Sequence, residues 1–454
     1  MAILIVAIIV LGYLLIGTSY WSGINKSAVA VFMCAVGWVL YICWGADFVS
    51  AQHGLDYADF LGDARATSSV VKDYISQHVF LKYVGRTSET VLFLLATLTI
   101  VEILSMNGCF DFVRYLMKSR RSATMLWWLS VVTFLISANL DNLTTTLMML
   151  GIMHSVISSR RDRMVFGSAI VISANCGGAL TVIGDPTGLV LWNMEAVTAT
   201  DYSLTLLVPC LIAWSLPIYL LSRMLPERIE CSFSMMPYRG DDARLSAWER
   251  MIFLIVGIGG LWFIPTFHNI THLSPFLGAI CVLGVLWIVN EFINRRFFHT
   301  DHRSRNTLPD VLKYGSVQMI LFVLGVMLSL GVLTEIGAMK FLSEQFENYV
   351  SNVWLEGVIA GSLSTILDNF ASAMAAISIG EEAAIAQGDI FWKVIAYATA
   401  VGGNVLAVGS MSGVALLISE RMHIGWFFRN VGWKALLSSL LGLIAMWAIY
   451  TLTI

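Results

Sequence analysis

Long apolar runs, separated by short polar segments, follow one another from the first residue of the chain to the last. At 1.5 Å per residue, a run of about 20 residues crosses the ~30 Å hydrocarbon core of a bilayer as a helix. The pattern therefore predicts an all-α membrane protein with about 10–11 transmembrane helices. The runs lie at 1–17, 27–44, 89–106, 164–198, 203–222, 250–266, 273–293, 315–334, 390–419 and 429–453, and a polar segment at 45–88 is predicted to be an extramembrane loop.

Two further apolar stretches, 125–158 and 353–380, are interrupted near the middle by the polar sequences SANLDNLTTT and STILDN. Basic residues flank the first stretch and acidic residues flank the second. The positive-inside rule therefore places both ends of the first in the cytoplasm, which suggests that the ends of the second lie outside. Both are predicted to be re-entrant hairpins, one from each face. The cytoplasmic charges in this topology include Lys26, Lys118, Arg120, Arg121, Arg160, Arg161 and Arg163, and the acidic flank is Glu344, Glu347, Glu381, Glu382 and Asp389.

The two halves of the chain repeat one another. Ser137, Asp141 and Asn142 recur 227 positions later as Ser364, Asp368 and Asn369, and four glycines between 177 and 188 recur 225 positions later between 402 and 413. The halves start on opposite faces, which makes them inverted repeats. The predicted organisation is a peripheral first helix at 1–26, repeat 1 at 27–222 with a hairpin at 125–158 and a broken helix at 164–198, a linker and peripheral helix at 223–272, and repeat 2 at 273–454 with a hairpin at 353–380 and a broken helix at 390–419.

Composition excludes several classes of protein. The chain is 57% hydrophobic and 13% charged, which leaves no room for a soluble domain, and its net charge of −3 argues against nucleic-acid binding. The seven cysteines show no metal-ligand spacing, and there is neither a His-Glu-x-x-His motif nor a serine nucleophile elbow. We therefore predict no enzyme activity and no cofactor, and the lipid bilayer as a partner.

A carboxylate within a membrane-buried segment costs ~2.5 to 3.5 kcal/mol, so Asp141 requires a partner or a function. The alternative is a loop aspartate that caps a short helix and faces water. Its repetition as Asp368 favours a functional role. Ser137 and Thr144 add hydroxyl oxygens beside Asp141.

The sequence ANCGGALTVIGDPTG, at 174–188, predicts a break in the middle of a transmembrane helix. Irregular backbone at that depth is tolerated only where it lines a cavity or is buried in protein. Free carbonyl groups together with Asn175, Asp185 and Thr187 form an oxygen-only site, which suits a hard cation such as sodium. A glycine notch for helix packing is the alternative, but it does not require Asp185.

The second broken helix has Ser410 and Ser412 in place of Asp185 and Thr187, so the predicted site has three carboxylates in an otherwise two-fold frame. Glu102 is a further acid, well inside the apolar run 89–106. It is a candidate proton relay, and the equally weighted alternative is an interfacial glutamate paired with an arginine such as Arg114.

At these motifs the chain resembles the NhaD family of sodium/proton antiporters, within a larger ion transporter superfamily that also holds sodium-coupled dicarboxylate carriers. The resemblance rests on SANLDNLTTT, SANCGGALTVIGDPT, STILDN and GGNVLAVGSMSGVA. It departs where the family has a run of threonines and this chain has Pro186, Thr187 and Gly188. The predicted cation and proton site is Ser137, Asp141, Asn142, Thr144, Asn175, Asp185, Thr187, Ser364, Asp368, Asn369, Ser410 and Ser412, with sodium held by Asp141, Asn142, Asn175, Asp185, Asp368 and Asn369.

The predicted function is the exchange of sodium or lithium for protons across the inner membrane of a bacterium. A protonated aspartate is a poor metal ligand, so competition between proton and cation for the same oxygens is sufficient for coupling. The alternatives are a sodium-coupled symporter of a dicarboxylate or another anion and, from a different class, a sensor on the same scaffold that transports nothing. A homodimer is implied by the resemblance alone.

Overall fold

The computed structural model describes residues 1–62, 65–113, 117, 121–229, 245–294, 314–350 and 352–453, and these contain helices and no strand. The first part of the chain forms α1 (Ala2–Gly17), α2 (Ser19–Ser22), α3 (Lys26–Trp44), α4 (Ala46–Gln52), α5 (Gly54–Leu61), α6 (Ser68–Tyr74), the π-helical η1 (Ile75–Phe80) and α7 (Leu81–Met106). The segment 45–88, predicted to be a loop, is therefore largely helical.

The middle of the chain forms α9 (Ser122–Ser137), α10 (Asn142–Val156), α11 (Arg160–Leu180), α12 (Pro186–Asn193), α13 (Ala199–Ser222), α14 (Ala247–Leu254), η2 (Ile255–Gly259), α15 (Gly260–Thr271) and α16 (Pro275–Asn294). The last part forms α18 (Tyr314–Glu335), α19 (Ala338–Tyr349), α20 (Val353–Ser364), α21 (Asn369–Glu382), α22 (Ile390–Gly402), α23 (Met411–Ser419), α24 (Ile424–Phe427), η4 (Phe428–Gly432) and α25 (Trp433–Thr453).

Eight helical segments among the described residues are long and apolar enough to cross a membrane, and four shorter apolar helices, α1, α9, α20 and α22, accompany them. This confirms the predicted multi-pass, all-α membrane protein. The eight segments are Lys26–Trp44, Ser68–Met106, Arg160–Leu180, Ala199–Ser222, Ala247–Thr271, Pro275–Asn294, Val317–Glu335 and Ile424–Leu452.

Helical structure stops at each of the four places where the sequence predicts an interruption. Residues 138–141 separate α9 from α10, and residues 365–368 separate α20 from α21; we call these two segments the hairpin tips. Residues 181–185 separate α11 from α12, and residues 403–410 separate α22 from α23. Glycine and proline explain the last two breaks, since neither supports a regular helix interior.

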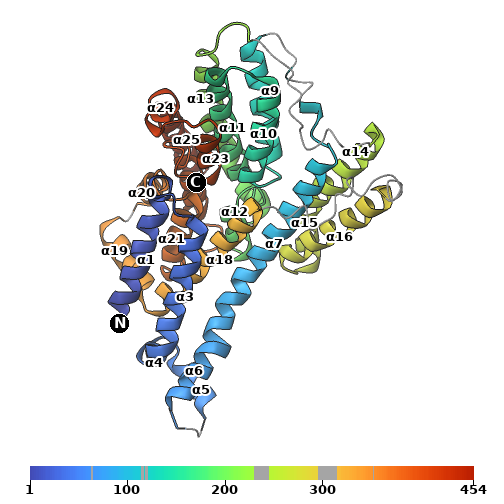
Figure 1. The fold of residues 1–454 in the computed structure, drawn as a ribbon. Coiled ribbons are helices and arrows are strands. Elements are labelled where there is room, and N and C mark those ends of the chain that lie inside the picture. Colours follow the sequence, from blue (N-terminus) through green and yellow to red (C-terminus); the bar gives the residue numbers. More distant parts are fainter. Residues whose placement is uncertain are drawn as a thin grey trace.

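The same helix pairs pack together in both halves. In each hairpin the first helix packs against the broken helix of its own half, α9 against α11 and α20 against α22. The pair α3 and α18 likewise matches the pair α16 and α7 (Figure 1). This arrangement is compatible with the predicted inverted repeat, but re-entry of each hairpin from one face stays a prediction because it depends on where the membrane lies.

A buried glutamate joins three helix ends at one end of the molecule. The Glu420 carboxylate, 1% exposed, lies 2.7 Å from His154 Nε2 at the end of α10 and 3.0 Å from Arg163 Nε in the first turn of α11. The Arg160 guanidinium donates to the backbone carbonyl of Glu420 at 2.9 Å. The cluster connects repeat 1 to the end of α23 in repeat 2.

Replacing Glu420 by Gln is expected to destabilise the protein at neutral pH by about 1–3 kcal/mol, the range for losing hydrogen bonds to a charged group. Burial alone raises the pKa of Glu420, but the hydrogen bonds from His154 and Arg163 outweigh it, so the pKa lies below its usual 4.5. A carboxyl group whose pKa is lower in the folded than in the unfolded protein stabilises the folded state at any pH above the unfolded pKa. This stabilisation is lost as the pH falls through the pKa of the folded state. In detergent, the unfolding temperature of Glu420→Gln should therefore be lower than that of the wild type at pH 7, and the difference should be smaller in acid. A difference that does not change with pH contradicts the role of the Glu420 charge in this cluster.

Candidate functional site

The residues that directly follow the two hairpin tips both donate a hydrogen bond to one carboxylate. The side-chain amide of Asn142, after the first tip, donates to Asp185 Oδ2 at 3.0 Å, and the amide of Asn369, after the second tip, donates to the same oxygen at 3.4 Å. All three side chains are buried. Asp185 stands in the break between α11 and α12, so three of the four breaks contribute to this contact.

Four helices begin around this contact, and each has a side-chain cap. Asp141 accepts from the Thr144 N–H at 3.0 Å, Asp185 from the Thr187 N–H at 2.9 Å, and Asp368 from the Phe370 N–H at 3.1 Å. Ser410 caps α23 by accepting from the Gly413 N–H at 3.1 Å. Helix N-termini carry partial positive charge, so three of the four positive ends are compensated by a carboxylate. We refer to Asp141, Asp185 and Asp368 as the site aspartates.

Close backbone packing holds each hairpin against its broken helix. The Ser137 hydroxyl donates to the Ala174 carbonyl at 2.6 Å, and the Ser364 hydroxyl donates to the Thr399 carbonyl, also at 2.6 Å. These two predicted site residues thus direct their hydroxyl protons at the backbone of α11 and α22. The two serines are 227 positions apart and make equivalent hydrogen bonds, so the two halves repeat this contact.

The two broken helices touch each other through polar side chains. The Asn175 amide donates to Asn404 Oδ1 at 2.9 Å and to Ser410 Oγ at 3.0 Å. Asn404 is not among the predicted cation ligands, although it belongs to the GGNVLAVGSMSG motif. Its place in the break between α22 and α23, opposite Asn175, identifies it as a further member of the site.

Several buried oxygen atoms near the breaks have no hydrogen-bond partner among the described residues. Buried polar atoms normally have a partner, and exceptions concentrate where ions, water or chemistry are involved. Oxygen atoms with free lone pairs are the ligands that alkali cations prefer. They are Asp141 Oδ1, Thr145 Oγ1, Thr146 Oγ1, Asn175 Oδ1, Ser372 Oγ and Ser412 Oγ.

Asp368 differs from the other site aspartates because it forms an ion pair. Lys26, counted above among the cytoplasmic charges, places its ammonium nitrogen 3.2 Å from Asp368 Oδ2 and 3.3 Å from the Val408 carbonyl oxygen. The Asp368 side chain is 1% exposed. Among the described ion pairs, this is the one that involves a site aspartate.

A cavity of about 20 Å³ lies at the meeting point, enough for one water-sized sphere. Its polar lining comes from both tips and from Asp185, and its apolar lining comes mainly from α18. Asp141 is not among the lining residues, so the predicted Asp141 and Asp185 pair does not enclose this cavity together. The lining is Asn142, Asp185, Pro186, Met319, Phe322, Val323, Asp368, Asn369, Phe370 and Met411.

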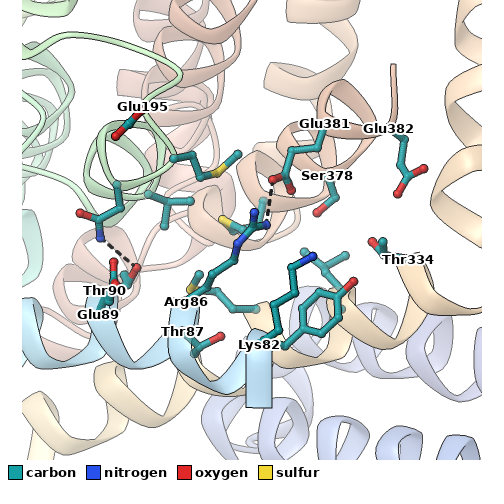
Figure 2. Close-up of a pocket in the computed structure, with 18 residues that line it drawn as sticks. Lys82, Arg86, Thr87, Glu89, Thr90, Glu195, Thr334, Ser378, Glu381 and Glu382 are labelled. Carbon is teal, nitrogen blue, oxygen red and sulfur yellow. Dashed lines mark hydrogen bonds and ion pairs between the residues drawn. The ribbon is translucent and has the colours of Figure 1, made fainter. Parts of the chain in front are cut away.

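A larger pocket of about 470 Å³, drawn in Figure 2, shares three lining helices with the small cavity. Three helices line both spaces: Pro186, Val323 and Phe370 line the small cavity, and the residues four positions later, Val190, Met327 and Met374, line the large one. Four positions correspond to about one helical turn. Successive turns of the same three helices therefore line the two spaces.

Charged groups surround the larger pocket. Figure 2 shows Lys82 and Arg86 of α7 facing it, with Arg86 directed at Glu381 of α21, and the guanidinium lies 3.3 Å from that carboxylate. Four glutamates and two cations line the pocket, which gives an excess of negative charge. The six are Lys82, Arg86, Glu89, Glu195, Glu381 and Glu382.

Glu102 does not line either space. It is buried in α7, 7% exposed. Arg114, its suggested partner, lies outside the described residues, so the choice between a proton relay and an interfacial pair stays open.

Comparison with known proteins identifies the family. Residues 1–402 match the family described as citrate transporter, CitMHS. The chain is 31% identical over 376 residues to sodium/proton antiporter 1 of Arabidopsis thaliana, an alignment that covers 81% of this chain and 63% of that protein, and so spans less than two thirds of its length. It is 30% identical over 371 residues to sodium/proton antiporter 2 of the same plant, covering 81% of this chain and 86% of the relative.

Bacterial relatives confirm the resemblance that the motifs indicate. The Na⁺/H⁺ antiporter NhaD of Vibrio parahaemolyticus is 26% identical over 386 residues, which cover 80% of this chain and 89% of that protein. The family match and these relatives extend over most of the chain rather than over isolated motifs. The chain is a multi-pass membrane transporter that belongs to the citrate transporter family, CitMHS, which is the family of its antiporter relatives.

Proposed function

We propose that this protein is a secondary active transporter that exchanges sodium or lithium for protons at the site aspartates. The observation that carries the proposal is the capping of three converging helix N-termini by carboxylates. Relatives named sodium/proton antiporter support the choice of ions. Asp185 is the central ligand, because amides from both hairpin tips fix its orientation.

The same caps argue against an anion as substrate, although the family description names citrate. A transported anion needs free N–H groups at helix N-termini. In this chain, the first-turn N–H groups of Thr144, Thr187 and Phe370 already bond to the site aspartates. A carboxylate 4 Å from an anion also repels it by ~1 kcal/mol in water, and by more at a lower effective dielectric.

Exchange follows from competition for the same oxygens. A cation at the site aspartates favours their ionised form, and protonation removes the charge that holds the cation. The Asp185 oxygen that accepts from Asn142 and Asn369 lies where both hairpins can respond to its occupancy. Access from alternate faces around a fixed site then gives exchange rather than leakage.

The negative pocket shown in Figure 2 is the proposed route to the site from one face. Its glutamates attract cations, since a cleft of one charge sign raises the local concentration of the opposite ion. Val190, Met327 and Met374 line this pocket one helical turn beyond Pro186, Val323 and Phe370 of the small cavity, so the proposed route requires these side chains to move.

We propose the inner membrane of a bacterium as the location, in line with the NhaD relatives from Vibrio and Halomonas. The Arabidopsis relatives indicate that related proteins also occur in a plant. The homodimer and the entry of the two hairpins from opposite faces belong to the same proposal.

The proposal is tested by the collapse of a pH gradient in everted vesicles on adding sodium, lithium, potassium or citrate. Sodium or lithium is expected to collapse the gradient at concentrations where potassium and citrate do not. Sodium uptake that requires citrate would instead identify an anion symporter. The absence of any ion-dependent flux in vesicles with normal protein levels would favour a sensor that does not transport.

A further inference from the structure

Lys26 is an unusual residue for its position. It is the first residue of α3, and a cation at a helix N-terminus is unfavourable because that end already carries partial positive charge. Its side chain is nevertheless only 11% exposed and contacts Asp368 Oδ2 at 3.2 Å. Placing a largely buried ammonium group at the positive end of a helix costs free energy. We infer that the contact with the Asp368 carboxylate compensates this cost.

The surroundings of this ion pair contain few other charges. Apart from Lys26, α1 and α3 have no charged residue, and the charged residues of α18 and α21 stand at their C-terminal ends, Glu335 in α18 and Glu381 and Glu382 in α21. Asp368 acts electrostatically on the Tyr13 phenol of α1 and on the Asp185 carboxylate. Lys26 also contacts the Val408 carbonyl, in the break between α22 and α23.

The ion pair breaks the symmetry of the two halves. Asp141, the counterpart of Asp368, has an oxygen with no partner among the described residues. The helix that corresponds to α3 is α16. Lys26 directly precedes the predicted span 27–44, whereas the residue that directly precedes the predicted span 273–293 is the exposed His272. The chain thus places one internal cation in a site with three carboxylates, beside the carboxylate of repeat 2.

We propose that Lys26 is an internal counter-cation that neutralises Asp368 and thereby sets the cation affinity of the other site aspartates. The inference rests on the proposed function. Lys26 acts through Asp368 and is a positioning residue rather than a ligand of the transported ion. Sodium and protons then exchange at Asp141 and Asp185. Because Lys26 neutralises Asp368, the pair adds no net charge to the electrostatic potential at these two carboxylates.

Opposite substitutions should have opposite effects. Lys26→Met leaves Asp368 as an uncompensated negative charge, so both sodium and protons bind more tightly at Asp185. The KM for sodium, measured at a pH where protons do not compete, is expected to fall on the order of tenfold. The pH midpoint of exchange is expected to rise by about one unit. Both magnitudes correspond to a unit charge ~10 Å away at an effective dielectric of ~20. Asp368→Asn leaves the ammonium uncompensated, so KM should rise and the midpoint should move to lower pH.

The double variant Lys26→Met/Asp368→Asn restores the net charge, so its KM and pH midpoint should lie between the opposite shifts of the two single variants. It also leaves no unpaired buried charge, so it tests the inference even if Lys26→Met fails to fold. Lys26→Arg keeps the charge and should behave like wild type in both quantities. Lys393→Met removes a different ion pair, between a buried lysine and the half-exposed Asp201 at 2.5 Å, and should move neither quantity.

The experiment measures sodium-dependent proton flux against pH and sodium concentration in proteoliposomes, with each variant checked by its size-exclusion profile. A purely structural role predicts lower flux in Lys26→Met with KM and pH midpoint unchanged, and this result would overturn the inference. Shifts of the same sign in Lys26→Met and Asp368→Asn would overturn it as well. If the wild-type protein shows no sodium-dependent flux, the proposed function itself fails; wild-type flux with unshifted variants refutes only the role of Lys26.

Discussion

Replacing Asp185 by Asn is expected to abolish sodium-dependent proton flux and leave the protein folded. The change removes the charge from the carboxylate on which Asn142 and Asn369 converge, while side-chain volume hardly changes. A unit charge about 4 Å from a bound cation contributes about 4 kcal/mol to its binding at an effective dielectric of ~20. Since every 1.4 kcal/mol is tenfold, sodium affinity should fall by a hundredfold or more.

Folding should survive because an asparagine still caps a helix well. Its side-chain oxygen can accept from the Thr187 N–H, as Asp185 does at 2.9 Å. Flux in proteoliposomes against sodium concentration measures the loss, with the size-exclusion profile and thermal unfolding as controls for structure. Asp201→Asn is the matched control, because Asp201 is half exposed and pairs with Lys393 away from the cavity.

Asp141→Asn should also abolish exchange, because Asp141 has an unpartnered carboxylate oxygen beside the same helix ends. Near-normal flux in a well-folded Asp185→Asn protein would remove Asp185 from the mechanism. Near-normal flux in Asp141→Asn alone would confine cation binding to the small cavity, which Asp141 does not line.

Adding a methyl group at Gly184 or Gly409 is expected to destabilise the whole site region. A Cβ at Gly184 would lie 2.6 Å from the Ser137 carbonyl oxygen, and a Cβ at Gly409 would overlap the Ser364 carbonyl oxygen more closely. Both contacts involve backbone, which cannot rotate away as a side chain can. Overpacking of this kind costs about 1–3 kcal/mol, occasionally more.

Thermal unfolding in detergent, followed by size-exclusion chromatography, measures the effect of Gly184→Ala and Gly409→Ala. Gly151→Ala, in the interior of α10, is the control, because an added Cβ there meets nothing within 4 Å. Alanine at an open helix position is neutral or stabilising. If Gly184→Ala and Gly409→Ala unfold at the same temperature as Gly151→Ala, the hairpins do not pack against the broken helices as described.

The sequence predicts the positions of the helix breaks because their causes are local. Gly184 and Gly409 disfavour helix at their own positions, Pro186 is favoured as the first residue of a helix, and Asp141 and Asp368 are recognisable as residues that favour helix N-termini. The structure starts α10, α12 and α21 directly after Asp141, Asp185 and Asp368. Local chemistry therefore determines where these helices begin.

The partners of the site residues were beyond prediction because they depend on how distant helices pack. Lys26 and Asp368 are 342 positions apart, and Asn369 and Asp185 are 184 positions apart. Hydropathy gives the spans but not which ends meet, so the contact between Lys26 and Asp368 could not be predicted, and the cytoplasmic placement of Lys26 stays a prediction. The segment 45–88 was misassigned for a similar reason: its buried residues, such as Val49 and Ile75, are apolar positions scattered among polar ones.

The most direct test of the central claim is proton release on sodium binding. Purified protein in weakly buffered detergent solution is mixed with sodium chloride near the pH midpoint of exchange, with choline chloride as the salt control, and the pH is recorded. Competition at the site aspartates predicts that sodium releases protons, that the sodium affinity falls as the pH is lowered, and that Asp185→Asn loses both effects. Sodium binding that releases no protons, or proton release that persists in Asp185→Asn, would contradict the account.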